Sequence, residues 1–321
     1  MPTTVLLGHP RWFRILHGAN PHTRDRWGRR KRVDKGLAIT QWERFRQTLT
    51  DLGVRVLVLP PSLDHPGAVF PANAGLRVGD TVYLSRPNPT RAEERALFRP
   101  FLESQGYRVA DLPSVPGGSD PPGTGHEESP QWEGEADTFP VGDPSGDPAK
   151  TVYLFTYGRL ERRRWAPRWG WPPYRRLFGF RTDARALSAI RAVTAPRGVL
   201  PLELADERYY HGDTCLCAFG PRRDSLMAYL PALTPAAQRQ LVERFGDRLV
   251  RLERPDAEAF AANAWQADTA SGPRLVIAAQ IRPELAAGLR ARGVEPLVVD
   301  VSEFTVTGGG SVKCLLLDLG A

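Results

Sequence analysis

Near the end of its 321 residues the chain has a segment, TGGGSVKC at 307–314, that places three glycines before one of its three cysteines. A thiol nucleophile needs a lowered pKa, a nearby proton carrier and a group that orients this carrier. Because glycines let amide N–H groups approach a sulfur or a substrate, the segment predicts a nucleophilic Cys314 whose thiolate is favoured. His211 can carry the proton, and the acidic segment at 133–137 can orient the histidine.

A second segment, YYHGDTCLC at 209–217, suggests a different chemistry. It places His211, Asp213, Cys215 and Cys217 at alternate positions, so on an extended strand these four metal-capable groups would share one face. Such ligands would be spread over roughly 20 Å, which is too far to close on one zinc ion. We therefore expect no metal site, and we interpret Cys215 and Cys217 as small apolar residues of a strand.

The composition is that of a globular protein with one large or two medium domains. The chain is 41% hydrophobic and 25% charged, and its longest apolar stretches have the length of strands rather than of membrane spans. The first residues lack the basic lead and apolar core of a signal peptide. Three unevenly spaced cysteines are too few for a disulfide framework. We expect a cytoplasmic protein with reduced thiols and no membrane association.

The net charge of +7 is concentrated in blocks. Residues 11–35 carry a net charge of +7, residues 114–149 a net charge of −8, and residues 159–181 a net charge of +7. An acidic block between two basic blocks indicates compensation within the molecule as readily as an anionic partner. A nucleic-acid partner is therefore not expected.

Two insertions interrupt the regular pattern of the chain. Residues at about 114–130 are acidic and rich in Pro and Gly, and their lack of apolar periodicity indicates a loop. Residues 159–178 interleave Arg with Trp and Tyr and contain several prolines, so they cannot form one continuous helix. We expect a surface hairpin or flap with Arg stacked on Trp in this second insertion. An active-site lid and an RNA-contacting patch are the alternatives.

Strand-like and helix-like segments alternate along the chain, which predicts an α/β fold. Apolar runs of strand length lie at 54–60, 80–85, 151–158, 225–231, 247–253, 274–281 and 295–302. Amphipathic segments, several of which stop at a glycine, lie between them at 38–53, 90–106, 183–194, 234–246 and 282–293.

A polar residue closes one strand-like segment after another at a nearly regular interval. The motif FPANA at 70–74 recurs as FAANA at 260–264. Successive intervals of 53, 64, 76, 50 and 51 residues separate the members of the series Asn20, Asn73, Asp137, Asp213, Asn263 and Cys314. This spacing predicts about five copies of one supersecondary unit. If each unit points its polar residue at a common centre, the units form a closed, propeller-like array with one axial site.

These motifs resemble those of the guanidino-group-modifying enzymes of the pentein, or amidinotransferase, superfamily. The resemblance spans the chain in family order and rests on NPHTRD at 20–25, FPANAG at 70–75, EGEAD at 133–137, FRTD at 180–183, HGDTC at 211–215 and EFTVTGGGSVKC at 303–314. It implies one catalytic domain over residues 1–321, with the fold of a five-bladed, pseudo-symmetric ββαβ propeller and a central active site.

Carried onto this sequence, the resemblance implies that Cys314 attacks the central guanidinium carbon and that His211 protonates the departing amine. His211 then activates the water that hydrolyses the covalent thiouronium intermediate, giving citrulline or ornithine. Asp213 would hold the guanidinium, and Glu133 or Asp137 would orient the histidine or share in holding the substrate. Carboxylates suit this task because a guanidinium stays protonated at pH 7. No cofactor is implied.

The resemblance also implies further substrate contacts. Arg181 would clamp the α-carboxylate of the substrate as a bidentate fork, while Asn20, Asn73 and Phe70 would line the pocket. Asparagines at 20 and 73, where deiminases use a carboxylate, favour a hydrolase similar to dimethylargininase or arginine dihydrolase. Gly67 stands where the family usually has an acidic residue, so the guanidino substrate itself stays open.

Two other functions remain possible from the sequence. An amidinotransferase would pass the amidino group to an amine instead of to water. A non-catalytic binding or assembly factor can use the same fold, but such a protein has no reason to keep Cys314, His211 and Asp213. The sequence leaves the oligomeric state open.

Overall fold

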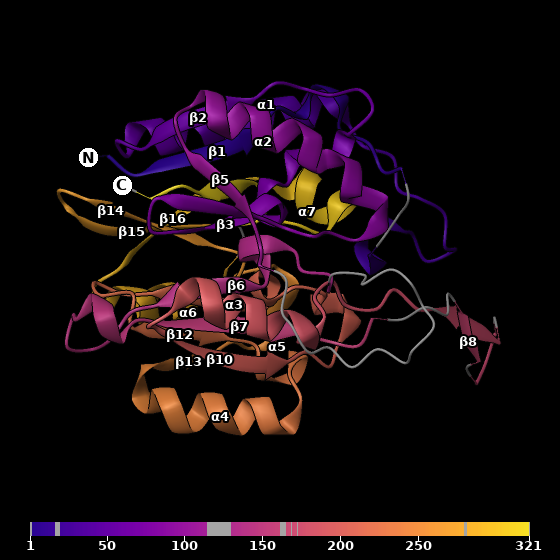
Figure 1. Cartoon of the computed structure of the whole chain (residues 1–321). Coiled ribbons are helices and arrows are strands. Elements are labelled where there is room, and N and C mark those ends of the chain that lie inside the picture. Colours follow the sequence, from indigo (N-terminus) through magenta and orange to yellow (C-terminus); the bar gives the residue numbers. More distant parts are fainter. Residues whose placement is uncertain are drawn as a thin grey trace, which may run out of the picture.

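The computed structural model describes residues 2–16, 20–113, 130–160, 165–167, 169–171, 173–278 and 281–320. Within these residues the chain folds into small sheets with helices packed around them, which confirms the predicted α/β class (Figure 1). The acidic insertion predicted at about 114–130 lies almost entirely outside the described residues. None of the described helices has the length and apolar character needed to cross a membrane.

Five three-stranded sheets in the described part of the chain share one topology, in which the central strand pairs antiparallel with one neighbour and parallel with the other. With the central strand in the middle of each group, the strands are β17 (Leu316–Asp318), β1 (Thr4–Gly8) and β2 (Arg55–Leu59); β3 (Gly75–Val78), β4 (Thr81–Leu84) and β5 (Arg108–Asp111); β6 (Thr138–Val141), β7 (Val152–Tyr157) and β10 (Gly198–Glu203); β11 (Leu216–Phe219), β12 (Ser225–Ala228) and β13 (Leu249–Arg251); β14 (Trp265–Thr269), β15 (Gly272–Ala278) and β16 (Glu295–Val299).

One α-helix lies in each connection between the two parallel strands of a sheet, because parallel neighbours need a crossover connection. These helices are α1 (Lys35–Asp51), α2 (Arg95–Ser104), α3 (Leu187–Thr194), α4 (Pro235–Phe245) and α6 (Pro283–Arg290). Each sheet with its helix is thus a ββαβ unit, the unit that the family resemblance implied. In the described part of the chain, the helices α5 (Arg254–Glu258) and α7 (Ser302–Gly308) lie outside this pattern.

The helix α4 shows how the sequence sets the bounds of these elements. The side chain of Thr234 accepts a hydrogen bond from the backbone N–H of Ala237 and so caps the first turn. Ala237, Leu241 and Phe245 recur every fourth residue and are buried, and each large apolar side chain contributes roughly 1.5–3 kcal/mol by leaving water. The helix ends at Gly246, whose φ of +50° favours glycine.

The central strands form the most deeply buried part of the molecule. Each contributes at least one side chain with no exposed surface, namely Leu6, Val82, Leu154, Leu226 and Val276. The first sheet combines both ends of the chain, since Leu6 of β1 lies opposite Leu317 of β17, and the two termini are neighbours in Figure 1. The last strand therefore completes the unit that the first strand begins.

The Arg/Trp-rich insertion contains a hairpin, as predicted. Its antiparallel strands β8 (Trp165–Pro167) and β9 (Tyr174–Arg176) project from the side of the molecule (Figure 1). The rings of Trp165 and Tyr174 meet edge to face, and Trp169 and Trp171 are exposed.

Candidate active site

Five equivalent turns bring the predicted polar residues together. The outer, antiparallel strand of each sheet (β3, β6, β11, β14 or β17) begins one to three residues after one member of the repeat series. These members are Asn73, Asp137, Asp213, Asn263 and Cys314. Asn20, the first member of the series in the sequence, follows the central strand β1 instead, so the interval of 53 residues before Asn73 does not belong to the structural repeat.

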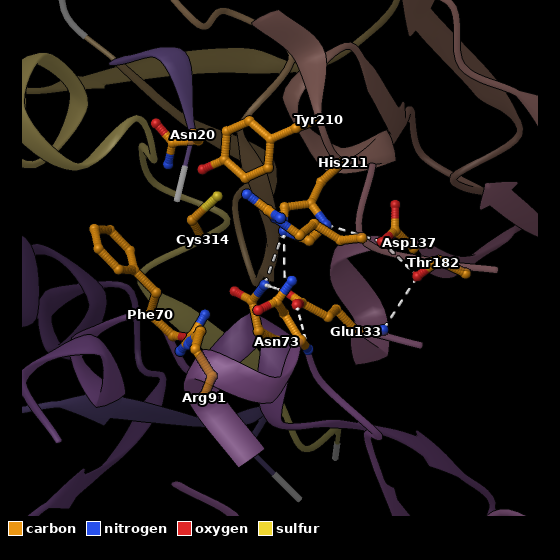
Figure 2. Close-up of polar contacts among 12 residues, drawn as sticks. Asn20, Phe70, Asn73, Arg91, Glu133, Asp137, Thr182, Tyr210, His211 and Cys314 are labelled. Atoms are coloured by element: carbon orange, nitrogen blue, oxygen red, sulfur yellow. Dashed lines mark hydrogen bonds and ion pairs between the residues drawn. The ribbon is translucent and has the colours of Figure 1, made fainter. Parts of the chain in front are cut away.

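A cavity of about 390 Å³ opens beside these turns, within the size range of small-molecule sites. The sequence-predicted residues that line it are Asn20, Phe70, Asn73, Glu133, Arg181, His211 and Cys314. Figure 2 shows all of them except Arg181 converging from different parts of the chain. Asp137 and Asp213 lie one layer behind the wall, where they contact His211 and Cys314.

Cys314 is held by two side chains. Asn263 donates a hydrogen bond from Nδ2 to the sulfur at 3.1 Å, and the thiol donates to Asp213 Oδ2 at 3.4 Å. Burial, and after it the Asp213 carboxylate, raises the pKa of Cys314 well above its usual value. The prediction that the surroundings favour a thiolate is therefore wrong for the free protein, because burial outweighs the hydrogen bonds donated to the sulfur.

The three glycines before Cys314 are required by close approach. A Cβ atom on Gly308 would lie 2.6 Å from Phe70 Cζ, and a Cβ atom on Gly310 would lie 2.9 Å from Cys314 Cβ. Gly309 has a φ of +77°, which ends α7 in the left-handed conformation. The absence of side chains at these three positions therefore leaves room for Phe70 and Cys314 to face the same cavity.

His211 lies between two carboxylates and is only 2% exposed. Its Nδ1 is 2.8 Å from Asp137 Oδ2, and its Nε2 is 3.2 Å from Glu133 Oε2. Burial alone would lower the pKa of His211, but Asp137 and then Glu133 raise it to about 9. The histidine therefore carries a proton at neutral pH.

Asp137 orients the histidine. Its Oδ1 accepts hydrogen bonds from Thr156 Oγ1 and from the Gly212 amide, and its Oδ2 accepts one from Thr182 Oγ1 besides facing His211. Both oxygens are occupied, and the residue is 1% exposed. The geometry thus differs from the expectation that Asp137 contacts the substrate directly.

Glu133 faces the cavity at the other side of the imidazole. Its Oε2 accepts a hydrogen bond from Asn73 Nδ2 at 2.6 Å, and the same nitrogen lies 2.9 Å from His211 Nε2. Burial alone would raise the pKa of Glu133, but the contact with His211, with Arg91 and Arg181 nearby, lowers it to about 2. Glu133 is therefore a fixed anion at the proton-transfer end of the histidine.

Asp213 has one oxygen free. Its Oδ2 accepts the thiol hydrogen of Cys314, while its buried Oδ1 has no hydrogen-bond partner among the described residues. Burial raises its pKa to about 6. Such a carboxylate oxygen is positioned to accept a hydrogen bond from a ligand, because an unpaired buried polar group costs free energy.

The other predicted contacts occupy different parts of the cavity. Arg181 is 5% exposed and places its guanidinium 5.5 Å from the centre of the Tyr210 ring. Asn20 donates from Nδ2 to the carbonyl of Gly308 at 2.8 Å and so ties the first loop to the glycine segment. Phe70 packs edge to face against aromatic neighbours and covers the cysteine side of the cavity.

The sequence did not assign a role to several residues of this site. Asn263 was visible as a member of the repeat but was not proposed as a contact of the cysteine. Tyr210, which donates to the carbonyl of Gly309 at 2.9 Å, lies in the segment YYHGDTCLC but was given no role. Arg91 and Glu94 line the cavity as an ion pair at 2.6 Å, although their spacing of three residues resembles that of a solvated helix surface.

The metal hypothesis gains no support from the described residues, which hold no group of three or more His, Cys, Asp or Glu side chains arranged as metal ligands. A 3-10 turn at Gly212–Thr214 also breaks the extended strand that this hypothesis required. Cys215 and Cys217 are buried in the apolar core, and Cys217 lies in β11 as predicted, whereas Cys215 precedes that strand.

Fold and site together define a class of enzyme that works on a small molecule with a buried cysteine and a histidine held by carboxylates. No family model matches the chain. N(G),N(G)-dimethylarginine dimethylaminohydrolase of Mycobacterium tuberculosis is 32% identical over 312 residues, which cover 97% of this chain and 83% of that protein. The bifunctional arginine dihydrolase/ornithine cyclodeaminase AgrE of a Nostoc species is 29% identical over 283 residues, and this chain spans 33% of its length.

Solved structures share the fold of this chain. The N-terminal domain of ArgZ, a cyanobacterial arginine dihydrolase solved with bound substrate, matches with a TM-score of 0.77 and 24% identity over 99% of this chain and 98% of that domain. Another structure of this domain, which has a covalently bound reaction intermediate, matches with a TM-score of 0.75 and 25% identity over 99% of this chain and 97% of that one. The chain belongs to the pentein family of enzymes that hydrolyse C–N bonds of guanidino groups.

Proposed function

We propose that the protein hydrolyses arginine or a methylated arginine through a covalent thiouronium intermediate on Cys314. One observation supports this proposal above all. A single cavity brings together the Cys314 thiol, which donates a hydrogen bond to Asp213, and a protonated His211 between two carboxylates. The relatives named as dimethylarginine dimethylaminohydrolase and arginine dihydrolase support the same substrate class.

The free carboxylate oxygen of Asp213 and the anion of Glu133 provide the charge that a guanidinium needs. A planar cation donates hydrogen bonds in several directions, so it can reach both carboxylates while its central carbon faces the sulfur. Asn73 holds Glu133 in place. Arg181, a cation on the same cavity, is suited to the carboxylate of the substrate.

Binding of the cation also activates the thiol. In the free protein the pKa of Cys314 is raised, so the sulfur keeps its proton. A guanidinium beside the sulfur favours the thiolate, and Asp213 Oδ2 already accepts the thiol hydrogen bond and can take this proton. Attack on the central carbon then forms the S–C bond, and the nucleophile is generated only when a substrate is present.

His211 acts next as acid and then as base. As an imidazolium it protonates the departing nitrogen, whose bond to carbon breaks and leaves the thiouronium. The neutral imidazole then takes a proton from water, and the resulting hydroxide attacks the same carbon. The C–S bond breaks to release a ureido product, and Asp213 returns the proton to the sulfur. One cycle on arginine gives citrulline and ammonia, whereas removal of both terminal nitrogens as ammonia leaves a carbamate that loses CO2 to give ornithine.

We also propose that the five ββαβ units are the blades of a closed propeller and that the whole chain is one catalytic domain. The pairing of β1 with β17 and the convergence of the five equivalent turns on one cavity support this arrangement.

The experiment is to incubate the purified protein with L-arginine and with methylated arginines, and to follow citrulline, ornithine, ammonia and methylamines by mass spectrometry. Cys314→Ser is the inactive variant, and Cys217→Ser is the matched control, since Cys217 is buried away from the cavity in the apolar core. Product from the wild type and Cys217→Ser alone supports the hydrolase and selects its product. If the wild type forms no product, even when amines are added as acceptors, both the hydrolase and the amidinotransferase proposals are overturned for these substrates.

A further inference from the structure

One corner of the cavity has no role in the chemistry described above. Glu94 is 7% exposed and lies in the cavity wall next to Arg91 and Gly67. Its Oε2 accepts two hydrogen bonds from Arg91, from Nη2 at 2.6 Å and from Nε at 2.9 Å. No described residue donates a hydrogen bond to its Oε1. The carboxylate is thus fixed through one oxygen and has the other available.

Gly67 makes room for this free oxygen. A Cβ atom at position 67 would lie only 2.5 Å from Glu94 Oε1. The carbonyl of Gly67 in turn accepts a hydrogen bond from Arg91 Nη2 at 2.9 Å, so the same arginine ties the two residues together. Oε1 therefore occupies the space that a side chain at position 67 would fill.

The other carboxylates of the cavity wall are either already bonded to neighbouring side chains or exposed to water. Glu133 is engaged with His211 and Asn73, and Asp64 and Glu93 are exposed to water. Glu94 is therefore the buried carboxylate of this wall that combines a fixed position with an available oxygen. Because Glu94 lines the cavity and its Oε1 has no donor from the described residues, this oxygen can accept a charge-assisted hydrogen bond from a cationic ligand.

We infer that Glu94 binds the α-ammonium group of the substrate and so selects amino acids among guanidino compounds. This inference rests on the proposed function, in which the guanidinium lies at Asp213 and Glu133. The Arg91 beside Glu94 acts electrostatically on Glu133, so both corners belong to one small cavity. An arginine-type substrate carries a second cation along its chain, and Glu94 Oε1 can accept a hydrogen bond from it.

The test compares L-arginine with 5-guanidinopentanoate, which keeps the guanidine and the carboxylate but lacks the α-amino group. We expect Glu94→Gln to lower kcat/KM for arginine about 10–100-fold, as for loss of a hydrogen bond to a charged group, mainly through KM. For 5-guanidinopentanoate we expect less than about a 3-fold change. Glu103→Gln, on the exposed surface of α2 and outside the cavity lining, is the control and is expected to change neither value.

A second variant separates recognition from folding. In Gly67→Ala, the added methyl group displaces Oε1, while the end of a flexible side chain can swing aside and leave the fold intact. We expect the same loss for arginine alone. Equal losses for both substrates, or no loss in either variant, overturn the inference while the proposed function stands. A wild type that turns over neither compound overturns the proposed function, and the inference with it.

Discussion

Asn263 and Cys314 are 51 residues apart in sequence, yet Asn263 Nδ2 donates a hydrogen bond to the cysteine sulfur at 3.1 Å. Its Oδ1 accepts hydrogen bonds from the amides of Ser311 and Cys314 at 2.8 and 3.1 Å. One amide side chain from the neighbouring repeat unit thus fixes the loop that carries the sulfur and stabilises negative charge on the sulfur. Folding and reactivity of the cysteine are coupled through this residue.

Replacing Asn263 by Ala should therefore impair both the stability of the fold and the reactivity of Cys314. The Ser311 and Cys314 amides lose their acceptor, so we expect the free energy of unfolding to fall by about 1–3 kcal/mol. Loss of the donor to sulfur should slow alkylation of Cys314 by iodoacetamide and lower kcat about 10–100-fold. Urea unfolding, alkylation followed by mass spectrometry and product release measure the three effects. Gln105→Ala on the surface is the control, and an alkylation rate equal to that of the wild type contradicts the coupling.

The glycine segment gives a matched pair of glycine-to-alanine changes. In Gly310→Ala the new methyl group would lie 2.9 Å from Cys314 Cβ and 3.0 Å from Phe70 Cε1. We expect a loss of about 1–3 kcal/mol from overpacking, together with at least a tenfold loss of kcat/KM. Gly288→Ala in α6 has no neighbour within 4 Å and should gain about 0.5–1 kcal/mol of stability with unchanged kcat. Thermal melts and initial rates check both, and an active Gly310→Ala would show that the absence of a side chain there is unnecessary.

The sequence revealed the repeat and most of the site. The alternation of strand-like and helix-like segments predicted the α/β class, and the spacing of polar residues predicted about five units and, from Asn73 to Cys314, the turns that meet. Asn20 joined that series only by coincidence of spacing, because it reaches the cavity from the loop after β1. Contacts between residues that are far apart in the sequence could thus be predicted where one local unit is repeated.

The sequence could not supply what depends on burial and on single contacts. Whether Glu133 or Asp137 faces His211 Nδ1 is decided by one 3-10 turn at Gly134–Ala136. The raised pKa of Cys314 follows from desolvation, which no local motif reports. Glu94 was part of a segment predicted as one helix at 90–106, but a 3-10 helix precedes α2 there and turns its carboxylate into the cavity wall.

The carboxylates around His211 predict an alkaline loss of stability. The pKa of His211 is raised from 6.5 to about 9 in the folded protein. The stabilisation is therefore complete below about pH 6.5, the unfolded value, and is lost as pH rises through about 9. We expect the free energy of unfolding to fall over this window by an amount on the order of 1–3 kcal/mol. His211→Gln should flatten that part of the curve in urea titrations at several pH values, and curves of equal slope for the variant and the wild type would contradict the assignment.

The buried ion pair beside the cysteine gives a prediction about stability that a double-mutant cycle can isolate. Lys313 Nζ lies 2.5 Å from Glu135 Oε1, which also accepts the amide of Asp318 at 2.7 Å. Burial raises the pKa of Glu135 to about 7, although Lys313 opposes this shift. Lys313→Met alone leaves an unpaired buried carboxylate and should cost about 3–5 kcal/mol. Lys313→Met with Glu135→Gln keeps the acceptor for Asp318 and should recover most of that loss. Urea unfolding of both single variants and the double variant gives the coupling energy, and additive losses would mean that the pair acts as two independent charges.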